Sequence, residues 1–144
     1  MMASDSQEKT ITGGCLCRAV RYEIKGDALM SGTCHCRDCQ RESGAGCMPV
    51  TGYMPQQVTI TGNTTEYSSP GDSGGIATRC FCPTCGSSLF GKPQSMPGMI
   101  LVTAGTMDDP ENFTSQMSIY TKSCPSWQTY DKNIPAFDAM PPKP

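Results

Sequence analysis

The chain has 144 residues and a formal net charge of −2 at pH 7, from 11 basic and 13 acidic side chains. This length fits one ordinary domain, and the balanced charge offers no basic surface for a phosphate backbone, which argues against nucleic acid as a partner. The best apolar run, residues 99–102, is far shorter than the roughly 20 residues that a helix needs to cross a bilayer, so no membrane insertion is expected.

The two ends of the chain differ in composition from its middle. Residues 1–10 are polar and lack the apolar core of a secretion signal, so we expect a flexible segment and a cytoplasmic protein. Residues 11–134 contain all the cysteines and the alternating patterns, and we expect them to form the single domain. Residues 135–144 are rich in proline, which predicts an extended tail.

Alternation of apolar and polar side chains predicts several strands. Residues 19–25 place every second, apolar residue on one face, as a half-buried strand does. Residues 57–62 repeat the pattern, and residues 64–67 are expected to be their hairpin partner. The short apolar run 99–103 predicts a buried central strand, and residues 115–120 predict a final strand.

Helix signals are weak throughout the chain. The best is residues 37–43, which contain no stop residue before Gly44. Residues 68–75 are rich in serine, proline and glycine and predict a loop able to reach over a site. The sequence therefore predicts a mainly β fold with little helix.

Ten cysteines are present, and eight of them form three tight clusters. The clusters are Cys15-x-Cys17, Cys34-x-Cys36-x-x-Cys39 and Cys80-x-Cys82-x-x-Cys85. Two residues separated by one position on a strand share a face, and Cys-x-x-Cys in a tight turn lets two sulfurs converge. Eight thiolates are enough to coordinate two tetrahedral zinc ions, and these ions would stabilise so small a fold by linking distant parts of the chain.

Disulfides and iron–sulfur clusters are the other uses of such cysteines. A reducing compartment argues against disulfides, and the cysteine runs typical of ferredoxins are absent. Cys47 and Cys124 lie outside the clusters and are expected to be a small buried side chain and a loop thiol. The ten methionines show no regular spacing and are expected to fill the core.

Three segments carry a family resemblance: GGCLCRAVRY at 13–22, CHCRDCQRESG at 34–44 and FCPTCGS at 81–87. Together they resemble the family of glutathione-dependent formaldehyde-activating enzymes and centromere protein V, and Trp127 with residues 134–137 is similar to the family's C-terminal end. The resemblance implies a β-tent fold with zinc at the strand ends. It also implies a structural zinc site formed by Cys15, Cys17, Cys82 and Cys85, and a second zinc held by Cys34, Cys36 and Cys39 with an open position.

Two residues depart from the family pattern. Arg18 stands where the family often has glycine, and this places a charge beside the structural site. Cys80 is not part of the pattern and is a possible fourth ligand of the second zinc. A fourth protein thiolate would leave no position for substrate, so the predicted catalysis depends on a vacancy there.

The resemblance implies a carbon–sulfur lyase that acts on adducts of a glutathione-like thiol with formaldehyde or a related carbonyl compound. Zinc prefers a thiolate among substrate groups, and three protein sulfurs leave a net negative centre that keeps the bound sulfur nucleophilic. The catalytic centre would then be Cys34, Cys36 and Cys39. A non-catalytic zinc-stabilised binding module and a thiol or zinc buffering protein are the alternatives.

Proton transfer at the second site needs a further group. The candidates nearby in sequence are His35, Asp38 and Glu42, and the His35 ring is expected to point away from the zinc because it lies between two cysteines that share a face. Arg37, Arg41 and Arg79 are expected either to offset the thiolate charge and hold a substrate carboxylate, or to be solvated surface residues.

Overall fold

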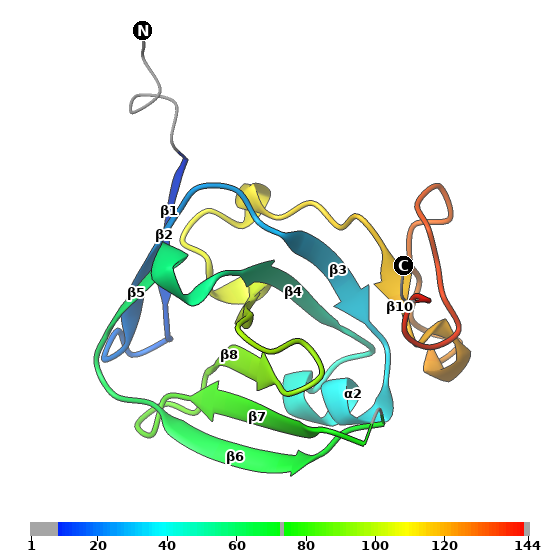
Figure 1. Ribbon diagram of the computed structural model, residues 1–144, viewed down its shortest axis with the longest axis horizontal. Coiled ribbons are helices and arrows are strands. Elements are labelled where there is room, and N and C mark those ends of the chain that lie inside the picture. The colour runs from blue at the N-terminus through cyan, green and yellow to red at the C-terminus, as the bar shows by residue number, and fades with distance from the viewer. Residues whose placement is uncertain (1–8, 73, 143–144) are drawn as a thin grey trace, which may run out of the picture.

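The computed structural model describes residues 9–72 and 74–142, and within them two β-sheets and one α-helix form the fold (Figure 1). The strands are β1 (Thr10–Gly14), β2 (Arg21–Lys25), β3 (Met30–Cys34), β4 (Met48–Tyr53), β5 (Val58–Thr61), β6 (Thr65–Pro70), β7 (Ile76–Phe81), β8 (Ser88–Pro93), β9 (Ile100–Thr103) and β10 (Ser118–Ile119). The helix is α2 (Arg37–Ser43), and the 3₁₀ turns are η1 (Pro55–Gln57), η2 (Ala104–Thr106), η3 (Pro110–Asn112) and η4 (Thr121–Ser123). The predicted β-tent fold, mainly β with little helix, is confirmed.

The smaller sheet contains three antiparallel strands in the order β1-β2-β5. Tyr22 and Ile24 of β2 are buried and their neighbours in the strand face outward, as the alternation in residues 19–25 predicts. The predicted hairpin between residues 57–62 and 64–67 is wrong, because β5 pairs with β2 and β6 pairs with β7 in the other sheet. Pairing with β2 lets Val58 pack against the core, and all six residues of β6 have a partner in β7.

The larger sheet has seven strands in the order β10-β3-β4-β9-β8-β7-β6. Its pairs are antiparallel except for β10, which runs parallel to β3. β9 lies between β4 and β8, so the prediction of a central strand at residues 99–103 is confirmed. The predicted final strand is shorter than expected, since only Ser118 and Ile119 of residues 115–120 form ladder bonds.

The core fills the space between the two sheets. Tyr22 of the small sheet meets Phe90 of the large sheet edge to face, with 5.6 Å between ring centroids. Val102 and Leu89 are fully buried in the same cluster. Because such contacts join residues far apart in the chain, the core fixes how the cysteine clusters approach one another.

The two faces of the large sheet have different roles. Phe90 is paired with Val102 and with Cys80, and residues opposite each other in a ladder share a face, so this row lies in the core. Gly91 is paired with Leu101 and Arg79, and this adjacent row lies on the opposite face. α2 and the C-terminal segment lie beside this second face (Figure 1).

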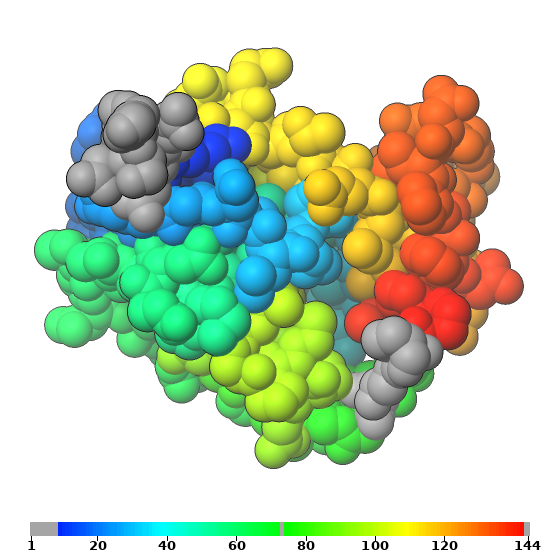
Figure 2. All heavy atoms as spheres, turned by 45° about the horizontal axis from the view of Figure 1, so that its top comes forward, coloured from blue at the N-terminus to red at the C-terminus, as the bar shows by residue number. Residues whose placement is uncertain are grey.

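The segment after residue 134 is held to β10. The Ser118 amide donates to the Pro135 carbonyl at 3.0 Å, and the Phe137 amide donates to the Ser118 carbonyl at 2.9 Å. The segment bridges to Ser118 at Ala136 and bends at residues 138–140, and it forms one wall beside the large sheet (Figure 2). Within the described residues, no helix is long and apolar enough to cross a membrane.

Candidate metal centres

The first cysteine group joins the two sheets. Cys15 and Cys17 follow β1, while Cys82 and Cys85 follow β7, and all four sulfurs lie within 4.8 Å of one another. The Cys17 sulfur is 3.7 Å from the sulfurs of both Cys15 and Cys82. Zinc–sulfur bonds of about 2.3 Å in a tetrahedron require a sulfur–sulfur distance of about 3.8 Å. The group therefore has the spacing of a four-thiolate metal site.

Backbone amides surround these sulfurs. The Val20 amide donates to the Cys15 sulfur at 3.3 Å, and the Thr84 amide donates to the Cys82 sulfur at 3.4 Å. Hydrogen bonds from Ser87, first from its hydroxyl and then from its backbone, lower the pKa of Cys85 to about 5. These donors stabilise thiolates, which are the form of cysteine that binds a metal.

Arg18 adopts a left-handed backbone with φ of 72°. Its amide donates to the Cys15 carbonyl at 3.1 Å, which closes the turn that carries Cys17. Glycine reaches this conformation without strain, whereas arginine does so at a cost. Arginine at this position is exposed, and the turn forms nonetheless.

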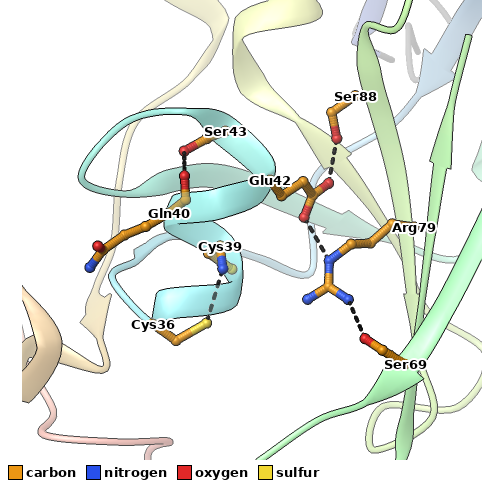
Figure 3. Close-up of polar contacts among 8 residues, drawn as sticks. All are labelled: Cys36, Cys39, Gln40, Glu42, Ser43, Ser69, Arg79 and Ser88. Carbon is orange, nitrogen blue, oxygen red and sulfur yellow. Dashed lines mark hydrogen bonds and ion pairs between the residues drawn. The ribbon is translucent and has the colours of Figure 1, made fainter.

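The second cysteine group lies where β3 passes into α2. Cys34 ends β3, Cys36 is the N-cap of α2, and Cys39 lies in its first turn. The Cys39 amide donates to the Cys36 sulfur at 3.3 Å (Figure 3). The three sulfurs lie within 4.8 Å of one another, so the prediction that these residues converge is confirmed.

The three thiols of this group shift one another's pKa values. Hydrogen bonds from the side chains of Cys34 and Cys39, and from nearby backbone amides, lower the pKa of Cys36 to about 2. The same contact with Cys36 raises the pKa of Cys34 to about 12, and contacts with Cys34 and Cys36 raise the pKa of Cys39. A divalent cation would supply the positive charge that lets all three sulfurs ionise together.

Cys80 lies apart from this group. It is buried in the core, and its sulfur is 3.7 Å from the Glu66 carboxylate. Burial is the main cause that raises the pKa of its thiol. The alternation of β7 explains its position, because Arg79 points toward α2 and the next residue must point to the opposite face. The compact group of sulfurs contains Cys34, Cys36 and Cys39 without Cys80.

His35 is fully buried behind the second group. Its Nδ1 atom lies 3.3 Å from the Ile119 carbonyl, and its ring meets Tyr130 edge to face at 5.4 Å. Its Nε2 atom has no hydrogen-bond partner among the described residues. His35 therefore packs against β10 and Tyr130 and is not part of the sulfur group.

Glu42 connects α2 to the large sheet through a polar network that the sequence did not predict (Figure 3). Its carboxylate accepts from Arg79 at 3.0 Å and from the Ser88 hydroxyl. Arg79 also donates to the Ser69 hydroxyl at 3.2 Å. Of the three arginines considered from the sequence, Arg79 is thus engaged by a protein carboxylate, while Arg37 and Arg41 are exposed.

A pocket of about 310 Å³ opens beside the second group, and Cys34 and Cys39 line it. Its floor is the second face of the large sheet, and Figure 2 shows the hollow between the segment near residue 30, the segment after β8 and the C-terminal segment. Five methionines line it: Met30, Met48, Met96, Met117 and Met140. Sequence reasoning missed this feature, because the methionines come from five separate segments.

The fold and these two groups define a class: a small, mainly β protein whose distant cysteines converge into one group of four sulfurs and one of three. The family model described as glutathione-dependent formaldehyde-activating enzyme matches residues 10–123. The chain belongs to this family.

The known proteins that are similar to parts of the chain include one from Schizosaccharomyces pombe and one from Rhodobacter sphaeroides. A Schizosaccharomyces pombe protein named as an uncharacterized lyase is 27% identical over 78 residues, which are 54% of this chain and 54% of the relative. The chain thus matches about half the length of that relative. A crystal structure of a Rhodobacter sphaeroides protein, a structural genomics target, superposes with a TM-score of 0.56 at 22% identity, covering 70% of this chain and 93% of that one. This likeness concerns the fold alone.

Proposed function

We propose that the protein is a zinc-dependent carbon–sulfur lyase whose catalytic centre is the group of Cys34, Cys36 and Cys39. One observation carries the proposal: this group of three sulfurs borders a pocket of small-molecule size. A structural zinc site is closed by four protein ligands, whereas a catalytic site keeps one position for substrate. The burial of Cys80 in the core supports the vacancy that catalysis needs.

The donor atoms support zinc at both groups. Each group offers only cysteine sulfurs, which select soft or borderline metals and not magnesium or calcium. In this proposal Cys15, Cys17, Cys82 and Cys85 hold a structural ion. When bound at the second group, zinc would supply a Lewis acid with affinity for the thiolate of a substrate.

Residues of the chain would perform the remaining steps. In cleavage of an S-hydroxymethyl adduct, the hydroxyl loses its proton, the carbon–sulfur bond breaks, and the carbonyl compound and a thiolate are released. Glu42 lies one helical turn after Cys39 and lines the same pocket, so its carboxylate is placed to accept that proton and to return it in the addition direction. Asp38 is exposed and does not line this pocket, and His35 is buried elsewhere.

The family description suggests a glutathione-like thiol with formaldehyde or a related carbonyl compound as the substrate class. Such reduced thiols are abundant in the cytoplasm, and we place the protein there as part of the same proposal. The partner is then a small molecule. The burial of Cys80 argues against a buffering role for this thiol, since buffering needs accessible thiols.

The test is an exchange measurement between ¹³C-formaldehyde and glutathione by NMR, with zinc-loaded protein. Wild-type protein should accelerate formation of the S-hydroxymethyl adduct, and Cys36→Ser should abolish the acceleration. Cys124→Ser is the control, because Cys124 lies outside both sulfur groups and serine can keep its hydrogen bond to the Gln128 carbonyl. Equal rates for wild-type protein, Cys36→Ser and buffer, with glutathione and with uncharged thiols alike, would refute the lyase proposal. If the protein then holds two zinc ions that added thiol does not displace, the alternative of a non-catalytic binding module is favoured.

A further inference from the structure

The pocket beside the second sulfur group is apolar along most of its wall. Besides the five methionines, Val50, Ile76, Pro93, Leu101 and Ile119 line it. We propose, as a refinement that rests on the proposed lyase function, that the group attached to the reacting sulfur is uncharged and apolar. A short alkyl or aryl thiol adduct fits this description better than an adduct of a charged tripeptide such as glutathione.

The charged side chains of the pocket already have partners. Glutathione carries two carboxylates and one ammonium group at neutral pH. Among the described residues that line the pocket, the cations are Arg79 and Lys92, which pair with Glu42 at 3.0 Å and Glu66 at 3.1 Å. The carboxylate of Asp72 accepts from the Tyr120 hydroxyl at 3.1 Å.

A glutathione carboxylate would therefore have to break an existing ion pair or be desolvated without a partner, and both are unfavourable. Lys92 is half exposed at the rim, so its pair with Glu66 is weak and it can turn toward a ligand. One such cation satisfies only one of the two carboxylates. The charged residues of the pocket therefore weaken the binding of glutathione and do not weaken the binding of a thiol with an uncharged substituent.

The methionines suit an apolar substituent of variable shape. A methionine side chain is unbranched and polarizable, so it adapts to ligands of different outline. A volume of about 310 Å³ lies at the lower end of the range for small-molecule pockets. Each methylene buried here should raise affinity about fourfold, until the pocket is filled.

Gly91 gives a way to fill the pocket from its floor. It lies between Leu101 and Arg79 in the ladder and has no side chain of its own. A Cβ atom added there would lie 3.6 Å from the Leu101 Cβ atom, an ordinary contact. Because Gly91 lines the pocket, we expect a larger side chain there to occupy part of it. Gly105 is the matched control, because a Cβ atom there meets nothing within 4 Å and the residue does not line the pocket.

The experiment uses zinc-loaded protein labelled with ¹³C at the methionine methyl groups. Titration with 1-butanethiol should shift the signals of the five lining methionines, while Met54 and Met107, which do not line the pocket, should stay in place. Glutathione should bind at least tenfold more weakly. Gly91→Val should weaken binding of 1-butanethiol at least tenfold, Gly91→Ala should act in the same direction, and Gly105→Val should bind like wild type.

Exchange of ¹³C-formaldehyde, measured with both thiols, separates this inference from the lyase proposal. Faster turnover with 1-butanethiol than with glutathione, lost in Cys36→Ser, supports both. Faster turnover with glutathione, accompanied by shifts of the lining methionines, overturns the apolar inference and keeps the lyase. Binding of 1-butanethiol without turnover of either thiol refutes the lyase and supports an apolar ligand pocket. Absence of methionine shifts with 1-butanethiol overturns the inference outright.

Discussion

Breaking the contact between Glu42 and Arg79 should destabilise the fold beside the second sulfur group. The Arg79 Nε atom and the Glu42 Oε1 atom lie 3.0 Å apart, with side-chain exposures of 19% and 16%. At an effective dielectric constant of about 20, the Coulomb attraction at this distance is about 5.5 kcal/mol. Desolvation of both charges cancels more than half of it, which leaves a coupling of about 2 kcal/mol.

A double-mutant cycle measures this coupling directly. Arg79→Met should lower the free energy of unfolding by about 3 kcal/mol, because it leaves the mostly buried Glu42 carboxylate without its cation and removes the hydrogen bond to Ser69. Glu42→Gln should cost about 2 kcal/mol, since the amide keeps a contact with Ser88 but loses the charge. The double variant should cost about 3 kcal/mol and not the additive 5.

The assay is urea unfolding followed by circular dichroism at a fixed excess of zinc, so that metal binding contributes equally to each variant. Lys92 and Glu66 form the control pair, at 3.1 Å but with side-chain exposures of 52% and 50%. Their cycle, Lys92→Met with Glu66→Gln, should give a coupling below about 0.5 kcal/mol. A Glu42–Arg79 coupling as small as that of the control pair would refute the reasoning from burial.

Three further predictions concern metal, pH and backbone. Cys82→Ser should lower the free energy of unfolding by more than about 4 kcal/mol, and Cys36→Ser by much less, because only the first sulfur group joins the two sheets. Elemental analysis should find one metal ion missing from each variant. Equal destabilisation by the two substitutions would contradict this role of the first group. Burial raises the pKa of Tyr22 to about 12, so its stabilisation is present below pH 10 and is lost as the pH rises toward 12. Tyr22 should account for a loss of about 1.4 kcal/mol at pH 11, measured in urea unfolding as the difference between the profiles of the wild type and Tyr22→Phe; identical pH profiles for the two proteins would count against it. Gly62→Ala should lower the free energy of unfolding by more than about 3 kcal/mol, and Gly44→Ala by about 1 kcal/mol. Both glycines have positive φ, but only at Gly62 would an added Cβ atom lie 2.2 Å from a carbonyl oxygen. Similar thermal midpoints for the two variants would exclude that clash.

The sequence predicted the features that depend on local geometry. The alternation in residues 19–25 and the helix at residues 37–43 follow from the period of side chains along the backbone, and both are present as β2 and α2. The spacing of Cys34, Cys36 and Cys39 likewise brings three sulfurs together within one strand end and one helical turn. The division of the other cysteines into a group of four came from family resemblance, and the geometry agrees with it.

The errors concern partners that are distant in the chain. Residues 64–67 directly follow a strand and have a suitable pattern, yet they pair with β7, because pairing depends on which apolar faces can be buried together. Glu42 and Arg79 are 37 positions apart, and no local pattern links them. Cys80 repeats the spacing of the second cluster, but the alternation of β7 turns its thiol into the core.

The sequence by itself determined the mainly β character, the helix that carries Cys36 and Cys39, and the grouping of three sulfurs, because each follows from the spacing of neighbouring residues. Only the tertiary structure decided that Cys80 is separated from that group and that Glu42 is held by Arg79. It also decided that five scattered methionines meet in one pocket. The physical reason is that backbone periodicity sets the direction of a side chain, whereas burial across the whole chain sets its neighbours.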